Sequence, residues 1–305
     1  MSKLAFFEGE IVPIEQAKIS IATHTFHYGT GCFAGMRAHW NSDREQLYIF
    51  RPADHFERLL HSARFLYCDV SYSAAELEAI TLELLRREGF RENVYIRPIV
   101  YKDEGVFRVW LHDANDKVAI FAHPAGGYLP NTEGISMCVS SWRRVDDTAI
   151  PARGKVNGSY VNSALAKSEA MLNGYDEAIL LNQDGHVSEA SAANFMIVRG
   201  GALITPPITA NLLEGVVRRT IVELARDELG VEIQEREIDR SELYMADEAF
   251  FCGTGVGMAS IGSIDRRTVG DGGKGEITAR LDELFQRILI GEHDRYRHWL
   301  APVYD

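Results

Sequence analysis

The sequence predicts an α+β fold of mixed strands and helices that is divided into two domains. The chain has 305 residues, which is more than one domain usually holds. Strand-like runs and helical patterns alternate irregularly along it. Two of the strand-like runs, 177–182 and 187–198, flank the turn sequence QDGH as in a hairpin. Hairpins mixed with helices favour an α+β fold over a doubly wound parallel sheet.

The first domain is expected over residues 1–125. Runs of β-branched and aromatic residues predict strands at 47–50, 94–102 and 118–125. A helix is expected after the first of these strands, because HFERLLHSARFL places its apolar side chains on one helical face. A second helix begins at a capping box formed by Ser73 and Glu76 and ends at Gly89.

A linker is expected at 126–134, because the sequence AGGYLPNTEG interrupts the periodic pattern with glycine, proline and polar residues. The second domain then covers 135–305. It begins with a strand at 135–142, and a helix follows from about 159 to 172. Two further amphipathic patterns, LLEGVVRRTIVELARDELG and EITARLDELFQRILIG, predict helices.

Composition and charge argue against several classes of function. The formal net charge is −12 and basic residues form no run, which argues against a nucleic-acid-binding surface. No apolar stretch approaches membrane-spanning length, and Glu8 interrupts the N-terminal segment too early for a signal peptide. The four cysteines lie far apart without a C-x-x-C pair, which favours reduced thiols over a zinc site. We therefore expect a cytoplasmic protein.

Three motifs point only weakly to other chemistries. The sequence GTGVGM (253–258) follows a predicted strand, but its spacing is not G-x-G-x-x-G and a further strand follows it. What is left is a tight glycine turn, which is either a plain β-turn or an anion site. His24 and His27 have H-x-x-H spacing but no carboxylate partner beside them, which favours structural histidines. The sequence has no G-x-S-x-G, which disfavours a serine hydrolase.

Lys155 is one of seven lysines in the chain, and it lies among small residues just before a predicted helix. A lysine held in a cavity near the positive end of a helix loses its proton more readily and can act as a Schiff-base nucleophile. The alternative is a solvated lysine in a loop. This stretch alone leaves both interpretations open.

Glu189 lies inside the predicted strand VSEASAANFMIV, among small and apolar residues. A carboxylate at such a position is costly unless a cationic group meets it, and a protonated pyridine nitrogen is one such group. The alternative is a carboxylate on the solvent face of the strand. Glu189 therefore shifts the balance towards a reactive Lys155, with the solvent-facing alternative still open.

With Lys155 and Glu189 in this order, the sequence resembles the fold type IV pyridoxal-phosphate transaminases, and among them the branched-chain amino acid aminotransferases. The resemblance covers nearly the whole chain. It is carried by FFEGEIVP, THTFHYGTGCFAGMR, FRPADHFERLLHSA, VYIRP, SSWRR, IPARGKVNGSYVNS, DGHVSEASAANFMIV, TPPITANLLEGVVRR and ADEAFFCGTG. It implies a two-domain fold with the active site between the domains. It also implies pyridoxal 5'-phosphate as cofactor, with pyridoxamine phosphate as its aminated form, and a homodimer or higher homo-oligomer.

The resemblance also implies how individual residues contact the cofactor. Lys155 forms the Schiff base, Glu189 pairs with the pyridine nitrogen, and Tyr160 hydrogen-bonds to the phenolic oxygen. Leu213 packs against the ring. The phosphate is held by Arg58, Gly215, the backbone N–H groups of Val216 and Val217 at a helix start, and the hydroxyl of Thr254.

Other residues are implied to surround the substrate. Thr254 and Gly255 meet the α-carboxylate through their backbone. The remaining side chains around the substrate are Tyr28, Phe33, Tyr95, Arg97, Tyr128, Ala192 and Val256, together with a residue between Gly105 and Val109. In the family, some of these residues come from a partner subunit.

The implied reaction transfers the amino group between branched-chain L-amino acids (Leu, Ile, Val) and 2-oxoglutarate. Alternatives within the fold are a D-amino acid transaminase, an (R)-amine transaminase and an aminodeoxychorismate lyase, and a further one is a non-catalytic binding protein. Val217 replaces a threonine that is common in the family, and Ala192 replaces a glycine. GTGVGM lacks the larger side chains that are usual after the turn, which favours a wider pocket.

Overall fold

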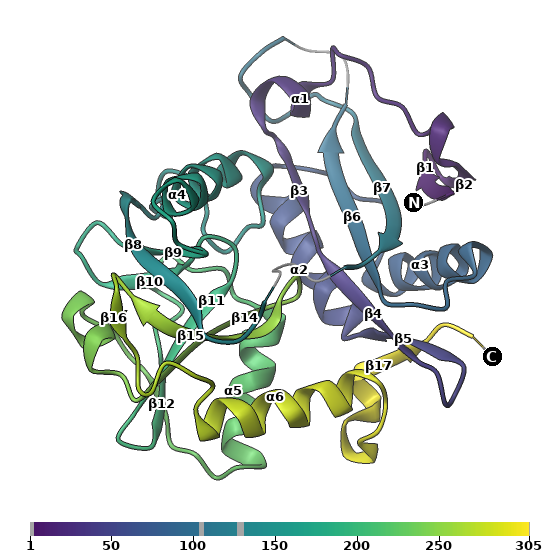
Figure 1. The fold of residues 1–305 in the computed structure, drawn as a ribbon. Coiled ribbons are helices and arrows are strands. Elements are labelled where there is room, and N and C mark those ends of the chain that lie inside the picture. Colours follow the sequence, from purple (N-terminus) through teal and green to yellow (C-terminus); the bar gives the residue numbers. More distant parts are fainter. Residues whose placement is uncertain (1–2, 104–106, 127–130, 305) are drawn as a thin grey trace. The chain divides into compact units, whose positions relative to one another are not determined.

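The computed structural model describes residues 3–103, 107–126 and 131–304 (Figure 1). Its residues form two compact units, each with its own sheet. The first unit comprises Met1–Gly126, Gly154–Ser159 and Arg287–Asp305, and the second comprises Gly127–Arg153 and Tyr160–Gln286. Each unit combines strands with helices, which confirms the predicted α+β class.

The first unit contains an eight-stranded antiparallel sheet in the order β17-β5-β4-β6-β7-β1-β2, with β3 paired to β6. The hairpin of β6 and β7 is paired from Val94 to Lys102 and is prominent in Figure 1. The strand predicted at 94–102 therefore has the predicted bounds. The strands are β1 (Leu4–Phe7), β2 (Glu10–Pro13), β3 (Gly31–Phe33), β4 (Met36–Asn41), β5 (Gln46–Phe50), β6 (Val94–Lys102), β7 (Asp116–Pro124) and β17 (Leu300–Pro302).

Two helices of the first unit, α2 (Pro52–Phe65) and α3 (Ala74–Glu88), pack against each other and against strands of this sheet. The capping box predicted for α3 is present, because the Ser73 hydroxyl accepts from the backbone N–H of Glu76 and the Glu76 carboxylate accepts from the backbone N–H of Ser73. Gly89 ends α3 in the left-handed conformation with φ 70°. A short helix, α1 (His24–Tyr28), precedes β3.

The second unit contains a nine-stranded mixed sheet in the order β10-β9-β8-β15-β14-β11-β12-β13, with β16 paired to β15. The β8–β9, β8–β15 and β12–β13 pairs are parallel, and the other pairs are antiparallel. The strands are β8 (Ile135–Arg143), β9 (Glu177–Leu181), β10 (Val187–Ala190), β11 (Asn194–Arg199), β12 (Ala202–Thr205), β13 (Ile233–Glu235), β14 (Glu248–Gly253), β15 (Gly257–Ile264) and β16 (Arg267–Thr268).

Helix α4 (Tyr160–Leu172) packs on β8 and β9 through the buried Ala166 and Ala170. The chain also forms α5 (Val216–Asp227), α6 (Glu276–Leu289) and the 3-10 turns η1 (Ile14–Gln16), η2 (Asn157–Ser159), η3 (Arg240–Met245) and η4 (Asp294–Trp299). Within the described ranges, no helix has both the length and the apolar character that a membrane crossing requires.

Two predicted elements differ from the structure. The single strand predicted at 187–198 is wrong, because β10 ends at Ala190 and β11 begins at Asn194. The backbone N–H of Ala190 donates to the oxygen of Ala193 at 2.8 Å, so a turn of small residues redirects the chain to a different part of the sheet. The helix predicted from Leu212 begins only at Val216, because Gly215 has extended backbone angles.

The two units also do not follow the chain in simple order. The sequence suggests one second domain over 135–305, but residues 154–159 and 287–305 group with the first unit. Strand β17 pairs with β5, and the 154–159 segment hydrogen-bonds to the first unit at Gly29 and Phe33. These partners lie more than a hundred residues away in the sequence, so the order of elements alone does not reveal them.

Candidate active site

Lys155 belongs to the first unit, and its backbone is held on both sides. Its carbonyl oxygen accepts from the backbone N–H of Phe33 at 3.1 Å, and its own N–H donates to the hydroxyl of Ser62 at 3.1 Å. The next residue, Val156, forms a β-bridge with Cys32. The Lys155 side chain is half-buried, so the structure does not support the alternative of a fully solvated loop lysine.

Ser62 connects Lys155 to Arg58. The Ser62 hydroxyl lies in α2, is fully buried, and donates to the carbonyl oxygen of Arg58 at 2.8 Å while it accepts from Lys155. One hydroxyl therefore links the backbones of two residues implied in cofactor binding. The Arg58 guanidinium also lies 3.5 Å from Nδ1 of His55, one helical turn earlier.

Phe33 lies close to both an amine and a guanidinium. The Nζ atom of Lys155 is 5.2 Å from the centre of the Phe33 ring, and Cζ of Arg97 is 4.3 Å from it. Arg97 Nη2 also donates to the Tyr95 hydroxyl at 3.1 Å. Tyr95 and Arg97 are two apart on β6 and therefore point to one face of the sheet. The structure thus brings Phe33, Tyr95, Arg97 and Lys155 together.

Gly35 leaves space for the Tyr95 hydroxyl. A Cβ atom at Gly35 would lie 2.1 Å from that hydroxyl oxygen, far inside van der Waals contact. A glycine at this position therefore allows Tyr95 to reach Arg97.

The remaining residues implied near the substrate in this unit are less enclosed. Tyr28 lies at the end of α1, is 40 % exposed, and contacts the ring of His24 at 4.7 Å between centroids. Phe107 and Val109 are exposed. Gly105 and Tyr128 fall outside the described residues.

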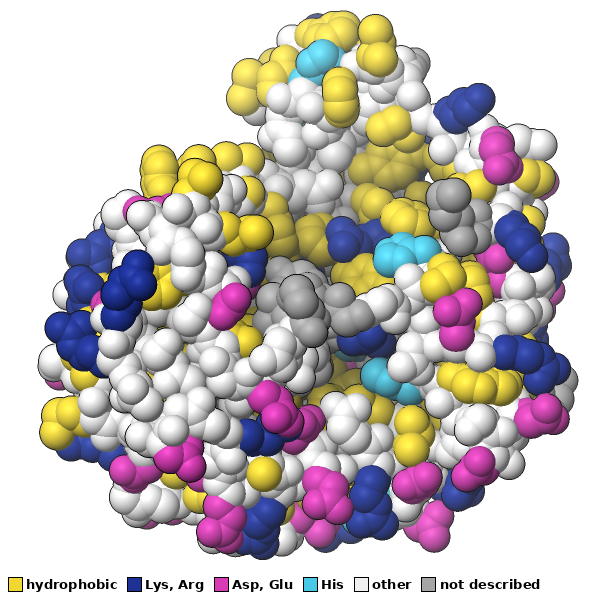
Figure 2. All heavy atoms as spheres, viewed as in Figure 1, with side chains coloured by type: hydrophobic (Ala, Val, Ile, Leu, Met, Phe, Trp, Pro, Cys, Tyr) yellow, Lys and Arg dark blue, Asp and Glu magenta, His cyan; other side chains and the backbone are white. Residues whose placement is uncertain are grey.

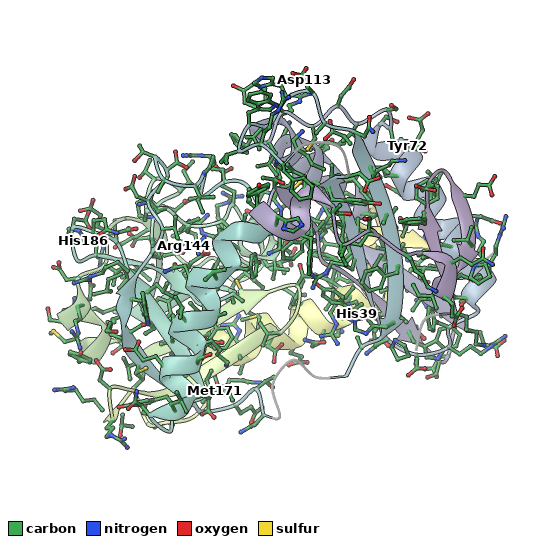
Figure 3. The ribbon with its side chains drawn as sticks, turned by 90° about the horizontal axis from the view of Figure 1, so that it is seen from above. His39, Tyr72, Asp113, Arg144, Met171 and His186 are labelled. Atoms are coloured by element: carbon green, nitrogen blue, oxygen red, sulfur yellow. The ribbon has the colours of Figure 1, made fainter. Side chains whose placement is uncertain are left out.

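In the second unit, Glu189 lies on β10 and is buried, with 4 % of its surface exposed. Its Oε1 atom is 2.8 Å from Nη2 of Arg144, and its Oε2 atom accepts from Asn194 Nδ2 at 3.0 Å and from the backbone N–H of Leu213 at 3.2 Å. The carboxylate therefore does not face solvent, as the alternative interpretation required. In Figure 3, Arg144 lies inward of His186 at the rim of this unit.

The start of α5 offers backbone donors. Its N-cap is Gly215, and the first turn contains no acidic residue. The side chains of Val216 and Val217 are buried, so these residues present only their backbone N–H groups at the helix start. Such groups, together with the helix dipole, form a site for an anion.

The glycine-rich sequence forms the tight turn between β14 and β15, where Gly253 pairs with Gly257. Gly257 has φ 73°, which favours glycine. Thr254 and Gly255 are half-buried in this turn, Val256 packs against the core of the unit, and Ala192 is exposed. Tyr160, the first residue of α4, is half-buried.

Three residues of these networks, Ser62, Arg144 and Asn194, are not predicted from the sequence. They act through hydrogen bonds to residues that are distant in the chain, so no local pattern marks them. The motif SSWRR contains Arg144, but the sequence alone does not show that its guanidinium meets Glu189.

Comparisons with known proteins show which family the chain resembles over its length. Residues 31–264 match the family Amino-transferase class IV. A probable branched-chain-amino-acid aminotransferase of Aquifex aeolicus is 50 % identical over 99 % of this chain and 97 % of its own length. The crystal structure of the branched-chain aminotransferase from Thermoproteus uzoniensis with norvaline superposes with a TM-score of 0.95 at 42 % identity, covering all of both chains.

The PLP-form of the branched-chain amino acid aminotransferase from Thermobaculum terrenum also has a TM-score of 0.95, at 37 % identity over 100 % of this chain and 99 % of that chain. The family match and the full-length similarity to these proteins confirm the resemblance seen in the sequence. The chain belongs to the class IV aminotransferases, the fold type IV pyridoxal-phosphate enzymes, and it is similar over its full length to branched-chain amino acid aminotransferases.

Proposed function

We propose that this enzyme transfers the amino group of L-leucine, L-isoleucine or L-valine to 2-oxoglutarate, which gives branched 2-oxo acids and L-glutamate. Pyridoxal 5'-phosphate is the cofactor, and pyridoxamine phosphate is its aminated form. The relatives that the chain matches are branched-chain aminotransferases, and one of them is a PLP-form structure.

One observation carries the choice of substrate. Phe33 contributes an apolar ring that is 8 % exposed, and the Arg97 guanidinium lies 4.3 Å from the centre of that ring. An aliphatic side chain such as that of leucine can pack on an apolar face, whereas the γ-carboxylate of glutamate needs a cation. The two substrates of the reaction thus have separate partners within a small area of the first unit.

The chain has a counterpart for each chemical group of the cofactor. An aldehyde needs an amine, which Lys155 supplies. A protonated ring nitrogen needs a carboxylate, and Glu189 is buried and already surrounded by donors that favour its ionised form. A phosphate needs N–H donors and a cation, which the start of α5 and Arg58 supply. The residues therefore fit pyridoxal phosphate.

When bound, pyridoxal phosphate acts as an electron sink for the bond between Cα of the amino acid and its hydrogen. We assign the proton transfer to Lys155, whose amine would take the proton from Cα of the amino acid and pass it to the former aldehyde carbon of the cofactor, with the reverse transfer in the second half-reaction. Glu189 accepts a hydrogen bond from the ring nitrogen. Tyr160 donates to the phenolic oxygen, and Leu213 packs against the ring.

The remaining proposed contacts bind the charged ends of cofactor and substrate. Arg58, Gly215 and the N–H groups of Val216 and Val217 hold the phosphate, with the Thr254 hydroxyl. The backbone of Thr254 and Gly255 binds the α-carboxylate. Around the side chain of the substrate we place Tyr28, Phe33, Tyr95, Arg97, Tyr128, Ala192, Val256 and a residue between Gly105 and Val109.

We also propose a homodimer as the smallest assembly, in the cytoplasm. In the first unit, large apolar side chains gather around α1, with Ile21 84 % and Phe26 70 % exposed (Figure 2). In the second unit, α4 exposes Val161, Leu165 and Leu172. Contiguous apolar surface of this kind is typical of an interface.

Burial raises the pKa of Cys138 to about 11 and of Cys252 to about 12, which keeps these thiols inert in a reducing compartment.

The test is to mix the cofactor-loaded enzyme, in separate stopped-flow experiments, with L-leucine, L-glutamate, D-alanine and (R)-1-phenylethylamine. Conversion of the cofactor to its aminated form is followed by absorbance. We expect fast conversion with L-leucine and L-glutamate and far slower conversion with the other two amines. Fast conversion by D-alanine or the (R)-amine without conversion by L-leucine would assign the enzyme to another branch of the fold.

A further inference from the structure

Arg144 is fixed at the point where its guanidinium meets Glu189. It follows the last residue of β8, and its backbone N–H donates to the oxygen of Leu181 at 2.9 Å, at the end of β9. Its Nη2 atom is 2.8 Å from Oε1 of Glu189, with 9 % of the Arg144 side chain and 6 % of the Glu189 side chain exposed. The two charges are therefore paired in an environment that shields them from water.

The same guanidinium also holds the segment that leads into α5. Its Nε atom donates to the carbonyl oxygen of Asn211 at 2.9 Å. Asn194, which is 4 % exposed, donates from Nδ2 both to Glu189 and to the carbonyl oxygen of Leu213 at 2.9 Å. Its Oδ1 atom would lie 2.0 Å from a Cβ at Gly215. Arg144 and Asn194 thus connect Glu189 to residues 211–215.

We infer that Arg144 is a positioning residue for this enzyme, which keeps Glu189 ionised and in one orientation so that Glu189 accepts a hydrogen bond from a protonated ring nitrogen of the cofactor. The inference rests on the proposed function. An ionised carboxylate is an acceptor only, whereas a protonated carboxyl group also donates and can satisfy an uncharged pyridine nitrogen. An uncharged ring is the weaker electron sink.

The physical reason is the burial of Glu189. A buried carboxylate without a cation tends to take up a proton, and a cation within hydrogen-bonding distance opposes this. Asn194 and the N–H of Leu213, which also donate to Glu189, are neutral. Arg144 therefore adds a positive charge to this network, directly beside the carboxylate.

The test compares two cofactors that differ at the ring nitrogen. One is pyridoxal phosphate, and the other is its 1-deaza analogue, which carries C–H in place of the nitrogen but keeps the aldehyde and the phosphate. The dissociation constants of both are measured by titration of the cofactor-free protein. Contacts to aldehyde and phosphate cancel in the ratio of the two constants, so the ratio reports the hydrogen bond to Glu189.

We expect the wild-type protein to prefer pyridoxal phosphate, and Arg144→Met to reduce this preference by about tenfold or more, the factor associated with one charge-assisted hydrogen bond. Arg144→Lys keeps the charge and should restore most of the preference. Arg236→Met is the matched control, because it removes another ion pair of the same unit, with Glu242 at 2.6 Å, and should leave the ratio unchanged.

A second comparison remains informative where Arg144→Met folds poorly. Glu189→Gln removes the negative charge that Arg144 meets. Adding Arg144→Met to the Glu189→Gln protein therefore leaves no uncompensated carboxylate, and it should not change the ratio of the two cofactor dissociation constants any further. If Arg144→Met weakened the binding of both cofactors equally and left the preference for pyridoxal phosphate intact, the inference would be overturned. A wild-type protein that binds neither cofactor would instead overturn the proposed function.

Discussion

At the scale of single residues, the enzyme combines an apolar face and a positive charge at Phe33 and Arg97. Cζ of Arg97 is 4.3 Å from the centre of the Phe33 ring, and Nη2 donates to the Tyr95 hydroxyl. The Nε atom of Arg97 is buried and has no hydrogen-bond partner among the residues that the structure describes. A half-buried guanidinium with an unsatisfied donor is suited to bind a carboxylate from outside the chain.

Arg97→Leu should therefore separate the two half-reactions. Loss of a charge-assisted contact to the γ-carboxylate costs about 2 to 5 kcal/mol, which slows the glutamate half-reaction about a hundredfold or more. Leucine presents only methyl groups, so its half-reaction should stay within about tenfold of wild type. Stopped-flow measurements with each amino acid test this. Arg91→Leu, at an exposed ion pair with Glu45, is the control, and equal losses for both substrates would show that Arg97 only supports the fold.

Lys155 and Glu189 could be predicted from the sequence because their charged side chains differ from those of their neighbours in the chain. Lys155 and Glu189 are charged groups among small or apolar neighbours, and such exceptions can be recognised without a structure. Ser62 and Arg144 are ordinary in their local sequence. Their importance arises from contacts with Lys155 and Glu189, which are 93 and 45 residues away in the chain.

At the scale of elements, α2 positions Lys155 through Ser62. The Ser62 hydroxyl is the acceptor for the backbone N–H of Lys155 and a donor to Arg58 in its own helix. This bond makes the 154–159 segment depend on α2, although the two are not neighbours in the sequence.

Ser62→Ala should therefore lower both stability and turnover. It leaves the N–H of Lys155 without its acceptor, which costs about 1 to 3 kcal/mol of unfolding free energy, and the loosened lysine should lower kcat. Ser73→Ala is the matched control, because it removes the capping hydroxyl of α3 at a cost of about 0.5 to 2 kcal/mol and should leave kcat unchanged. Urea unfolding and steady-state kinetics test the pair. A Ser62→Ala enzyme with wild-type kcat would contradict this role.

The turn between β9 and β10 contains a histidine surrounded by carboxylates. His186 Nδ1 lies 3.2 Å from Asp184, and Nε2 lies 3.6 Å from Glu237 and 3.5 Å from Asp239. The close approach of the Asp184 carboxylate, followed by the charges of Glu237 and Asp239, raises the pKa of His186 above its usual value. The charged imidazole therefore ties the turn to the segment before η3.

This contact should make stability depend on pH. Because the folded-state pKa is raised, His186 contributes stability that is fully present below the unfolded value of about 6.5 and is lost as pH rises through the folded value. His186→Gln should accordingly destabilise the enzyme more at pH 5.5 than at pH 9. Thermal unfolding at both values tests this, with the exposed His298→Gln as control. A His186→Gln penalty that is equal at both pH values would argue against the contact.

Elements with strong local signals are predicted well, and those set by tertiary pairing are not. The strand at 94–102 and the capping box at Ser73 follow from local sequence alone. The run 187–198 has the composition of one strand, but β10 pairs with β9 whereas β11 pairs with β12 and β14. Only these long-range pairings divide it.

At the scale of the whole molecule, the chain returns to the first unit for two short segments. The fold class follows from the mixture of strands and helices in the sequence. The assignment of 154–159 to the first unit does not, since that segment lies between two parts of the second unit along the chain. Lys155 is thereby placed beside Phe33 and Ser62 instead of among its sequence neighbours.

The central claim is that Lys155 is the residue that binds the cofactor covalently. The most direct measurement is reduction of the loaded enzyme with borohydride, followed by proteolysis and mass spectrometry of the peptides. We expect the reduced cofactor on the peptide that contains Lys155, and a Lys155→Ala enzyme that retains no cofactor after reduction and denaturation and has almost no turnover. Attachment to another lysine, or ordinary turnover by Lys155→Ala, would contradict the account.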